Sequence, residues 1–122
     1  MSEDPEGLAG ARTLAFAALA IVILGNTAGN VLLKHGATSA HRYPSLLGLN
    51  VVTIAGIACF AFAILAYAWS LKHVELNVAQ MVVSVQYICV IGAAALVFGE
   101  QISPMQWLGF GLIGLGIFVC SR

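Results

Sequence analysis

The stretch YPSLLGLNVVTIAGIACFAFAILAYAWSL, residues 43–71, contains no Asp, Glu, Lys or Arg in 29 consecutive positions. A helix needs about 20 mainly apolar residues to cross the hydrocarbon core of a bilayer. Backbone polar groups find no water there, so a spanning segment must be a helix or part of a closed barrel. Barrel strands alternate in polarity over about 10 residues, and this stretch is longer and continuously apolar. We therefore predict a transmembrane helix over about 46–70.

Three further charge-free stretches flank it, at 13–33, 76–99 and 101–121. They predict helices over about 13–34, 76–98 and 104–120. The connections are short, which makes consecutive helices antiparallel neighbours. The sequence thus predicts an all-α membrane protein, a four-transmembrane-helix bundle with short loops.

The composition of the whole chain agrees with lipid as its solvent. Of the 122 residues, 61% are hydrophobic and 8% are charged, whereas a soluble domain has about 25% charged residues. The five basic residues balance the five acidic ones, so there is no basic patch for nucleic acid. We divide the chain into a flexible acidic tail, 1–11, and a transmembrane domain, 12–122. These values argue against a soluble enzyme and against a nucleic-acid-binding protein.

The cysteines and histidines show no metal-ligand spacing. Each cysteine lies inside a predicted helix and each histidine stands singly at a helix edge: Cys59, Cys89, Cys120, His35, His41 and His73. We therefore predict no metal site, no cofactor and no catalytic residue.

The basic residues give a weak indication of orientation. The face that holds both termini carries Arg12, Lys72 and Arg122, and the opposite face carries Lys34 and Arg42. Basic residues favour the cytoplasmic side, which places both termini in the cytoplasm. The difference is small enough that dual topology is also compatible.

A polar ridge runs along the end of the first predicted helix. Asn26, Asn30 and Lys34 are spaced i, i+4, i+8, so they lie on one side of a helix. Next to them, Gly25 and Gly29 form a small-xxx-small pair that favours helix association. The ridge has two interpretations: the amides bond to neighbouring helices while Lys34 reaches the interface, or the ridge lines a pathway for a polar or anionic group.

The third predicted helix offers an opposite wall. Asn77, Gln80, Ser84 and Tyr87 recur at spacings of three or four and share a face, while Gln86 points elsewhere. Interhelical hydrogen bonding is the alternative role of that face. The charges that bracket this helix, Glu75 and Glu100, are expected to be solvated at the headgroup level. Since no Asp or Glu lies inside a predicted helix, the usual carboxylate proton relay is not expected.

Glycines mark one side of the last predicted helix. Gly109, Leu112, Ile113 and Gly116 lie on that side, and glycines let helix backbones approach closely. We predict a dimer seam or a helix-packing seam there. Aromatic residues near helix ends fit interfacial belts: Tyr43, Tyr67, Trp69 and Trp107.

These features resemble the small multidrug resistance family of the drug/metabolite transporter superfamily, over about 12–120. The similar motifs are the Gly-Asn-x-x-x-Lys end of the first helix, Phe98-Gly99-Glu100, and a dimerisation pattern matched by Gly109, Leu112, Ile113, Gly116 and Ile117. Drug exporters of the family carry a glutamate in the first helix where this chain has Asn26, and third-helix aromatics where it has Gln80 and Val83. An amide neither exchanges a proton near neutral pH nor neutralises a cation.

A second branch, the aminoarabinose-phosphoundecaprenol flippase subunits, resembles this chain more closely. Ala28-Gly29-Asn30 with Lys34 matches its first-helix motif, with Asn in place of Gln, and its third-helix motif is matched by Ser84, Gln86 and Tyr87. The resemblance implies a flippase, or a flippase subunit, for a polyprenyl-phosphate-linked sugar in the bacterial inner membrane, without enzyme activity.

The same resemblance implies roles for individual residues. Asn26, Asn30, Gln80 and Ser84 would bond the sugar or phosphate, and Lys34, with Arg42, would attract the phosphate. Four helices leave little room for a cavity, so we expect a homodimer or a heterodimer with a similar small protein. Two other functions stay open: transport of a small metabolite or cation, and a non-transporting accessory subunit.

Overall fold

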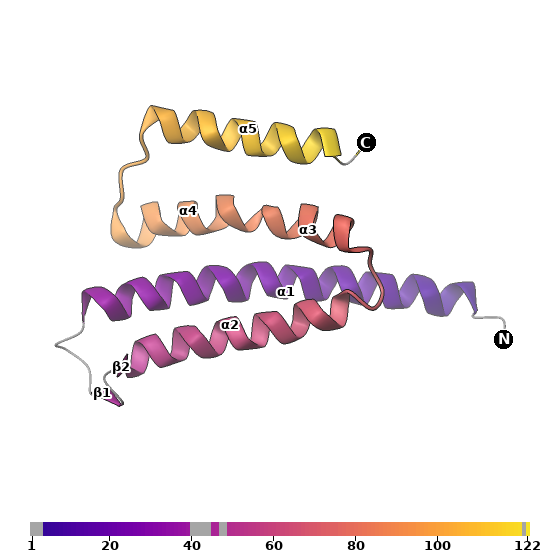
Figure 1. Ribbon diagram of the computed structural model, residues 1–122, viewed down its shortest axis with the longest axis horizontal. Helices are drawn as coiled ribbons and strands as arrows, with labels where there is room; N and C mark the ends of the chain where they lie inside the picture. The colour runs from indigo at the N-terminus through magenta and orange to yellow at the C-terminus, as the bar shows by residue number, and fades with distance from the viewer. Residues whose placement is uncertain (1–3, 40–44, 47–48, 121) are drawn as a thin grey trace.

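The computed structural model describes residues 4–39, 45–46, 49–120 and 122. Within them the helices are α1 (Pro5–Thr38), α2 (Val51–Ser70), α3 (Leu76–Ser84), α4 (Gln86–Phe98) and α5 (Pro104–Cys120). Strands β1 (Ser45–Leu46) and β2 (Leu49–Asn50) form a small antiparallel pair between α1 and α2. The helices lie side by side in the order α2, α1, α3 with α4, and α5 (Figure 1).

The helix lengths match membrane spans. α1 has 34 residues, which corresponds to about 51 Å at 1.5 Å per residue and exceeds a hydrocarbon core of about 30 Å. α2 has 20 residues, the third span Leu76–Phe98 has 23 and consists of α3, Val85 and α4, and both spans are strongly apolar. α5 is a shorter apolar helix of 17 residues. The prediction of an all-helical protein with four apolar helices is confirmed.

Two predicted boundaries are wrong. α1 begins at Pro5 rather than at 13, and proline suits the first helical turn, so residues 5–11 belong to this helix. α2 begins at Val51 rather than at 46, because residues 45–46 and 49–50 pair as strands. Both termini lie at one end of the molecule (Figure 1). His41, Arg42 and Tyr43 lie outside the described residues.

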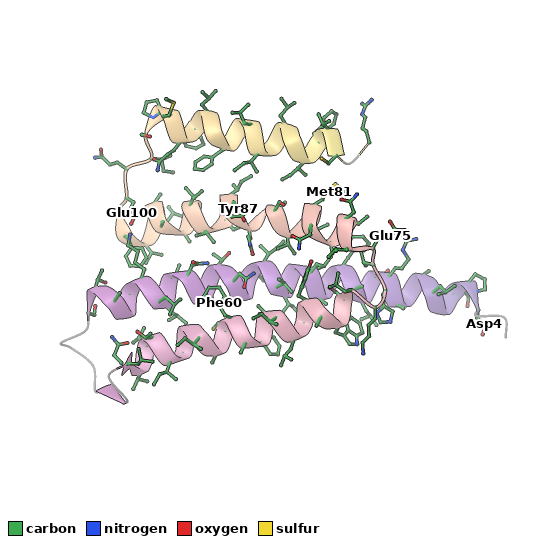
Figure 2. All side chains as sticks on the ribbon, in the orientation of Figure 1. Asp4, Phe60, Glu75, Met81, Tyr87 and Glu100 are labelled. Atoms are coloured by element: carbon green, nitrogen blue, oxygen red, sulfur yellow. The ribbon has the colours of Figure 1, made fainter. Side chains whose placement is uncertain are left out.

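Close glycine contacts hold α1 against α2. A Cβ atom added at Gly56 would lie 3.1 Å from the carbonyl oxygen of Gly29 and 3.1 Å from the backbone nitrogen of Leu33. Figure 2 shows Phe60 on the side of α2 that faces α1, where its ring would be 2.8 Å from a Cβ at Gly29. The prediction that Gly25 and Gly29 serve helix packing is confirmed, since Gly25 lies against Ala63.

Asn50 ties the start of α2 to the end of α1. Its Oδ1 accepts a 2.8 Å hydrogen bond from the backbone nitrogen of Thr53, and its Nδ2 donates a 2.5 Å bond to the carbonyl oxygen of Gly36. Asparagine is a strong N-cap residue because its side-chain oxygen satisfies a free helical N–H group. Asn50 is buried, so this cap also fixes where the two helices meet.

The third span is interrupted at Val85, between α3 and α4. The Ser84 hydroxyl donates a 2.7 Å bond to the carbonyl oxygen of Gln80, and the Val85 nitrogen donates to the carbonyl oxygen of Val82 at 3.2 Å. A serine that bonds back four residues often bends a helix. Val85 itself keeps right-handed helical dihedral angles (φ −59°, ψ −24°), so the interruption is local.

Candidate functional site

The polar ridge of α1 faces the third span. Asn26 Nδ2 donates a 2.6 Å hydrogen bond to Gln86 Oε1 on α4. Asn30 Nδ2 donates a 2.8 Å bond to the carbonyl oxygen of Asn26, and the Lys34 ammonium forms an ion pair with the Glu100 carboxylate. Because adjacent helical residues differ by about 100°, the glycines of α1 face α2 while the ridge faces α4.

An inner cavity of about 250 Å³ adjoins Asn26. It lies between α1, α2, α3 and α4, and four of its lining side chains are polar: Asn26, Tyr67, Gln80 and Gln86. They form two hydrogen-bonded pairs, since Gln80 Nε2 donates to the Tyr67 hydroxyl at 2.8 Å. The inner cavity therefore presents amide and phenol groups on half of its lining residues, and the other half are apolar: Val22, Ala63, Ile64 and Val83.

An outer cavity of about 290 Å³ adjoins Lys34 at the end of the molecule opposite the termini. Asn30, Lys34 and Glu100 supply its polar groups, and apolar residues of α1 and α4 supply the rest. The side chains of Lys34 and Glu100 are 43% and 45% exposed. Glu100 is exposed at the end of the third span, as predicted, and it also pairs with Lys34, which the sequence did not predict. Figure 2 shows Glu100 after the end of α4.

The four residues predicted to share a face of the third span do share one, but that face lies against α5 and only Gln80 also reaches the inner cavity. Asn77, Ser84 and Tyr87 line a crevice of about 330 Å³ against α5, which we call the α5 crevice. Gln80 lines both this crevice and the inner cavity. The expectation that all four residues oppose the ridge is therefore wrong for three of them. Gln86, expected to point elsewhere than this set, provides the contact with the ridge.

The glycine side of α5 forms the other wall of the α5 crevice. Ile113, Gly116 and Ile117 line it, while Leu112 is 61% exposed. A Cβ at Gly109 or Gly116 would meet nothing within 4 Å, so these glycines make no close backbone contact within the described part of this chain. Their role in a dimer stays a prediction.

Two residues near the ridge were missed as site residues from the sequence. Tyr67 was assigned to an interfacial belt, yet its hydroxyl bonds Gln80. Its phenol in an otherwise apolar helix could have indicated this contact, because a Tyr hydroxyl buried among apolar groups usually finds a hydrogen-bond partner. Glu100 gave no comparable signal, since only the fold brings it to Lys34. Among the described residues, no three His, Cys, Asp or Glu side chains lie together to hold a metal ion.

The chemistry of this site is that of binding. Amides donate and accept hydrogen bonds, and a lysine ammonium donates to oxygen anions. The inner cavity thus suits a polar uncharged group, whereas the outer cavity holds the Lys34–Glu100 ion pair beside the Asn30 amide.

Comparison with known proteins gives the family. The model of the EamA-like transporter family matches residues 4–122. Proteins named probable 4-amino-4-deoxy-L-arabinose-phosphoundecaprenol flippase subunit ArnE, from Aeromonas hydrophila and Aeromonas salmonicida, are 30% and 29% identical to this chain, over 80% of it and 89% of each relative. A protein of the same name from Pseudomonas savastanoi is 27% identical over 54% of this chain, and the match spans 58% of that relative.

No solved structure matches the chain. The family match covers nearly its whole length, and its apolar helices agree with a membrane location. The chain therefore belongs to the EamA-like transporter family of the drug/metabolite transporter superfamily and is a multi-pass membrane protein.

Proposed function

We propose that this protein is a flippase, or one subunit of a flippase, that moves a polyprenyl-phosphate-linked sugar across the bacterial inner membrane. The observation that carries the proposal is the polar ridge with a cavity at each end. Asn26 lines the inner cavity, and Asn30 and Lys34 line the outer one. The names of the Aeromonas and Pseudomonas relatives support the substrate class.

Each part of such a lipid has a chemical counterpart in the protein. Asn26, Gln80 and Gln86 offer hydrogen bonds to sugar hydroxyls. Lys34 offers a point charge to the phosphate, with Asn30 beside it. Ser84 and Tyr87 lie in the α5 crevice, where Ile113 and Ile117 supply apolar surface. The prenyl chain would stay in the lipid, at a gap between helices, while the headgroup crosses.

The working unit is proposed to contain a second chain. The helices lie in a row with α2 and α5 at its edges (Figure 1), and the outer cavity opens beside half-exposed charges. A second copy, or a similar small membrane protein, would close this side. We place the contact on α5, along Gly109, Leu112, Ile113, Gly116 and Ile117. The relatives are named as flippase subunits, which agrees with an assembly of more than one chain.

A binding and flipping assay tests the proposal. The protein, reconstituted in vesicles in its native oligomeric state, is given undecaprenyl phosphate carrying a pentose or hexose. Membrane-impermeant periodate then measures how fast inner-leaflet sugar becomes accessible. We expect faster exposure with the wild type than with empty vesicles, and loss of that gain in Lys34→Gln. Lys72→Gln is the matched control, because Lys72 lies exposed in the connection between α2 and α3.

Two results would count against the proposal. Proton-competitive binding of a quaternary ammonium compound would favour a cation transporter instead. Full activity after Asn30→Leu combined with Lys34→Leu would favour an accessory subunit, because the ridge would then play no part in transport.

A further inference from the structure

The anion-binding group of the site already has a partner. Lys34 pairs with Glu100, and its ammonium lies 5.0 Å from the centre of the Phe98 ring. Lys34 comes from α1, whereas Phe98 and Glu100 come from the end of α4 and the residues after it. A phosphate that binds Lys34 must therefore share it with this carboxylate or replace it.

The exposure of the Lys34–Glu100 pair would allow another anion to replace Glu100. Both side chains are nearly half exposed, and ion pairs at such exposure contribute little to stability. The phosphate of a polyprenyl-phosphate-linked sugar is a diester with one negative charge, as a carboxylate has, so it can take the place of the Glu100 carboxylate on Lys34 without changing the net charge of the cavity. Asn30 lines the same outer cavity, so a phosphate there has a second polar neighbour.

Glu100 also sits on a segment that can be repositioned. It follows Gly99, whose φ of +66° is the left-handed conformation that ends α4 and that glycine adopts without a steric cost. Residues 99–103 have no regular secondary structure, and α5 begins at Pro104. Releasing Glu100 from Lys34 therefore removes a contact between α1 and the connection that leads into α5.

We propose that Glu100 is an internal competitor of the substrate phosphate and thereby sets the affinity of the site for anionic headgroups. In the protein without substrate, the Glu100 carboxylate forms an ion pair with the Lys34 ammonium. The phosphate of an incoming lipid displaces the carboxylate and binds Lys34 beside Asn30, and the α4–α5 connection is released from α1. This inference rests on the proposed function, because it assumes that Lys34 receives the phosphate.

Binding of undecaprenyl phosphate to the protein in phosphatidylcholine nanodiscs tests the inference. Glu100→Gln should bind this probe roughly two- to fivefold more tightly than wild type, which is the gain expected from removing a half-exposed ion pair. Lys34→Gln should lose most of the binding, and adding Glu100→Gln to it should restore none. Glu75→Gln, at the opposite end of the third span (Figure 2), should bind like the wild type.

A second measurement uses the wild type alone, in case Glu100→Gln folds poorly. A carbodiimide joins paired amines and carboxylates directly, so it should crosslink Lys34 to Glu100, and undecaprenyl phosphate should protect against this crosslink. Unchanged or weaker binding by folded Glu100→Gln, or a crosslink unaffected by saturating probe, would overturn the inference. If the inference is overturned in this way but the wild type still binds the probe through Lys34, the proposed function stands. Absence of binding by wild type and Glu100→Gln alike would overturn both.

Discussion

The amide of Asn26 donates a 2.6 Å hydrogen bond to Gln86, sixty residues later in the chain, and this bond joins α1 to α4. The contact between the two helices at this point is therefore made by two neutral amides. Gln80 and Tyr67 pair with each other along the same lining, so all four polar side chains of the inner cavity are hydrogen-bonded, and a ligand would use the donors and acceptors that these two bonds leave over.

The first prediction concerns this bond. Asn26→Leu and Gln86→Leu should each destabilise the protein by roughly 1 kcal/mol, because each leaves one amide without its partner. The double variant should show a coupling energy of about 0.6 kcal/mol, which is typical of hydrogen bonds between membrane helices. Reversible unfolding in mixed micelles measures all three variants. Strictly additive effects would show that the two amides do not interact.

The second prediction concerns the crossing of α1 and α2. Gly56→Ala should destabilise the protein by about 1–3 kcal/mol, because the added methyl group meets backbone atoms of Gly29 and Leu33 and forces the helices apart. Gly92→Ala is the matched control, since a Cβ at Gly92 meets nothing within 4 Å. The control should be neutral or gain up to about 1 kcal/mol from better helix propensity. Equal stability of both variants would contradict the close crossing.

The third prediction separates the inner cavity from the α5 crevice. Tyr67→Phe removes a hydroxyl that faces the inner cavity, and its loss should reduce sugar-lipid flipping about fivefold, which corresponds to one hydrogen bond of about 1 kcal/mol. Tyr87→Phe makes the same chemical change in the α5 crevice and should have a smaller effect. Flipping rates and melting temperatures of the two variants decide between the sites. A larger loss for Tyr87→Phe would place the headgroup in the α5 crevice.

The fourth prediction concerns the interruption at Val85. Ser84→Ala removes the hydroxyl that bonds the carbonyl oxygen of Gln80, and the third span should become straighter. Spin labels at Leu76 and Val97 should then move apart, while stability changes by less than about 0.5 kcal/mol. Ser70→Ala, whose hydroxyl bonds the Tyr67 carbonyl oxygen in α2, should leave that distance unchanged. An unaltered distance in Ser84→Ala would assign the break to packing against α1 and α5.

Much of the fold was predictable because the bilayer imposes a local rule. A long stretch without charge must form a helix in lipid, so the charge-free stretch at 43–71 was sufficient to predict α2. The ends of the helices were less predictable, since each depends on a single residue. Pro5 lies in the first turn of α1, and Asn50 caps α2 directly after the short strand pair. The polar ridge was predictable too, because a spacing of four places residues on one helix face whatever surrounds the helix.

The sequence by itself determined the four apolar helices, the ridge of Asn26, Asn30 and Lys34, and the resemblance to a transporter family. Only the tertiary structure decided which groups meet this ridge: Gln86 rather than Ser84 or Tyr87, and Glu100 on Lys34. The reason is physical. Helical periodicity determines which residues share a face, but the rotation of each helix about its axis follows from contacts with its neighbours, here the Gly29–Gly56 crossing and the Asn26–Gln86 hydrogen bond.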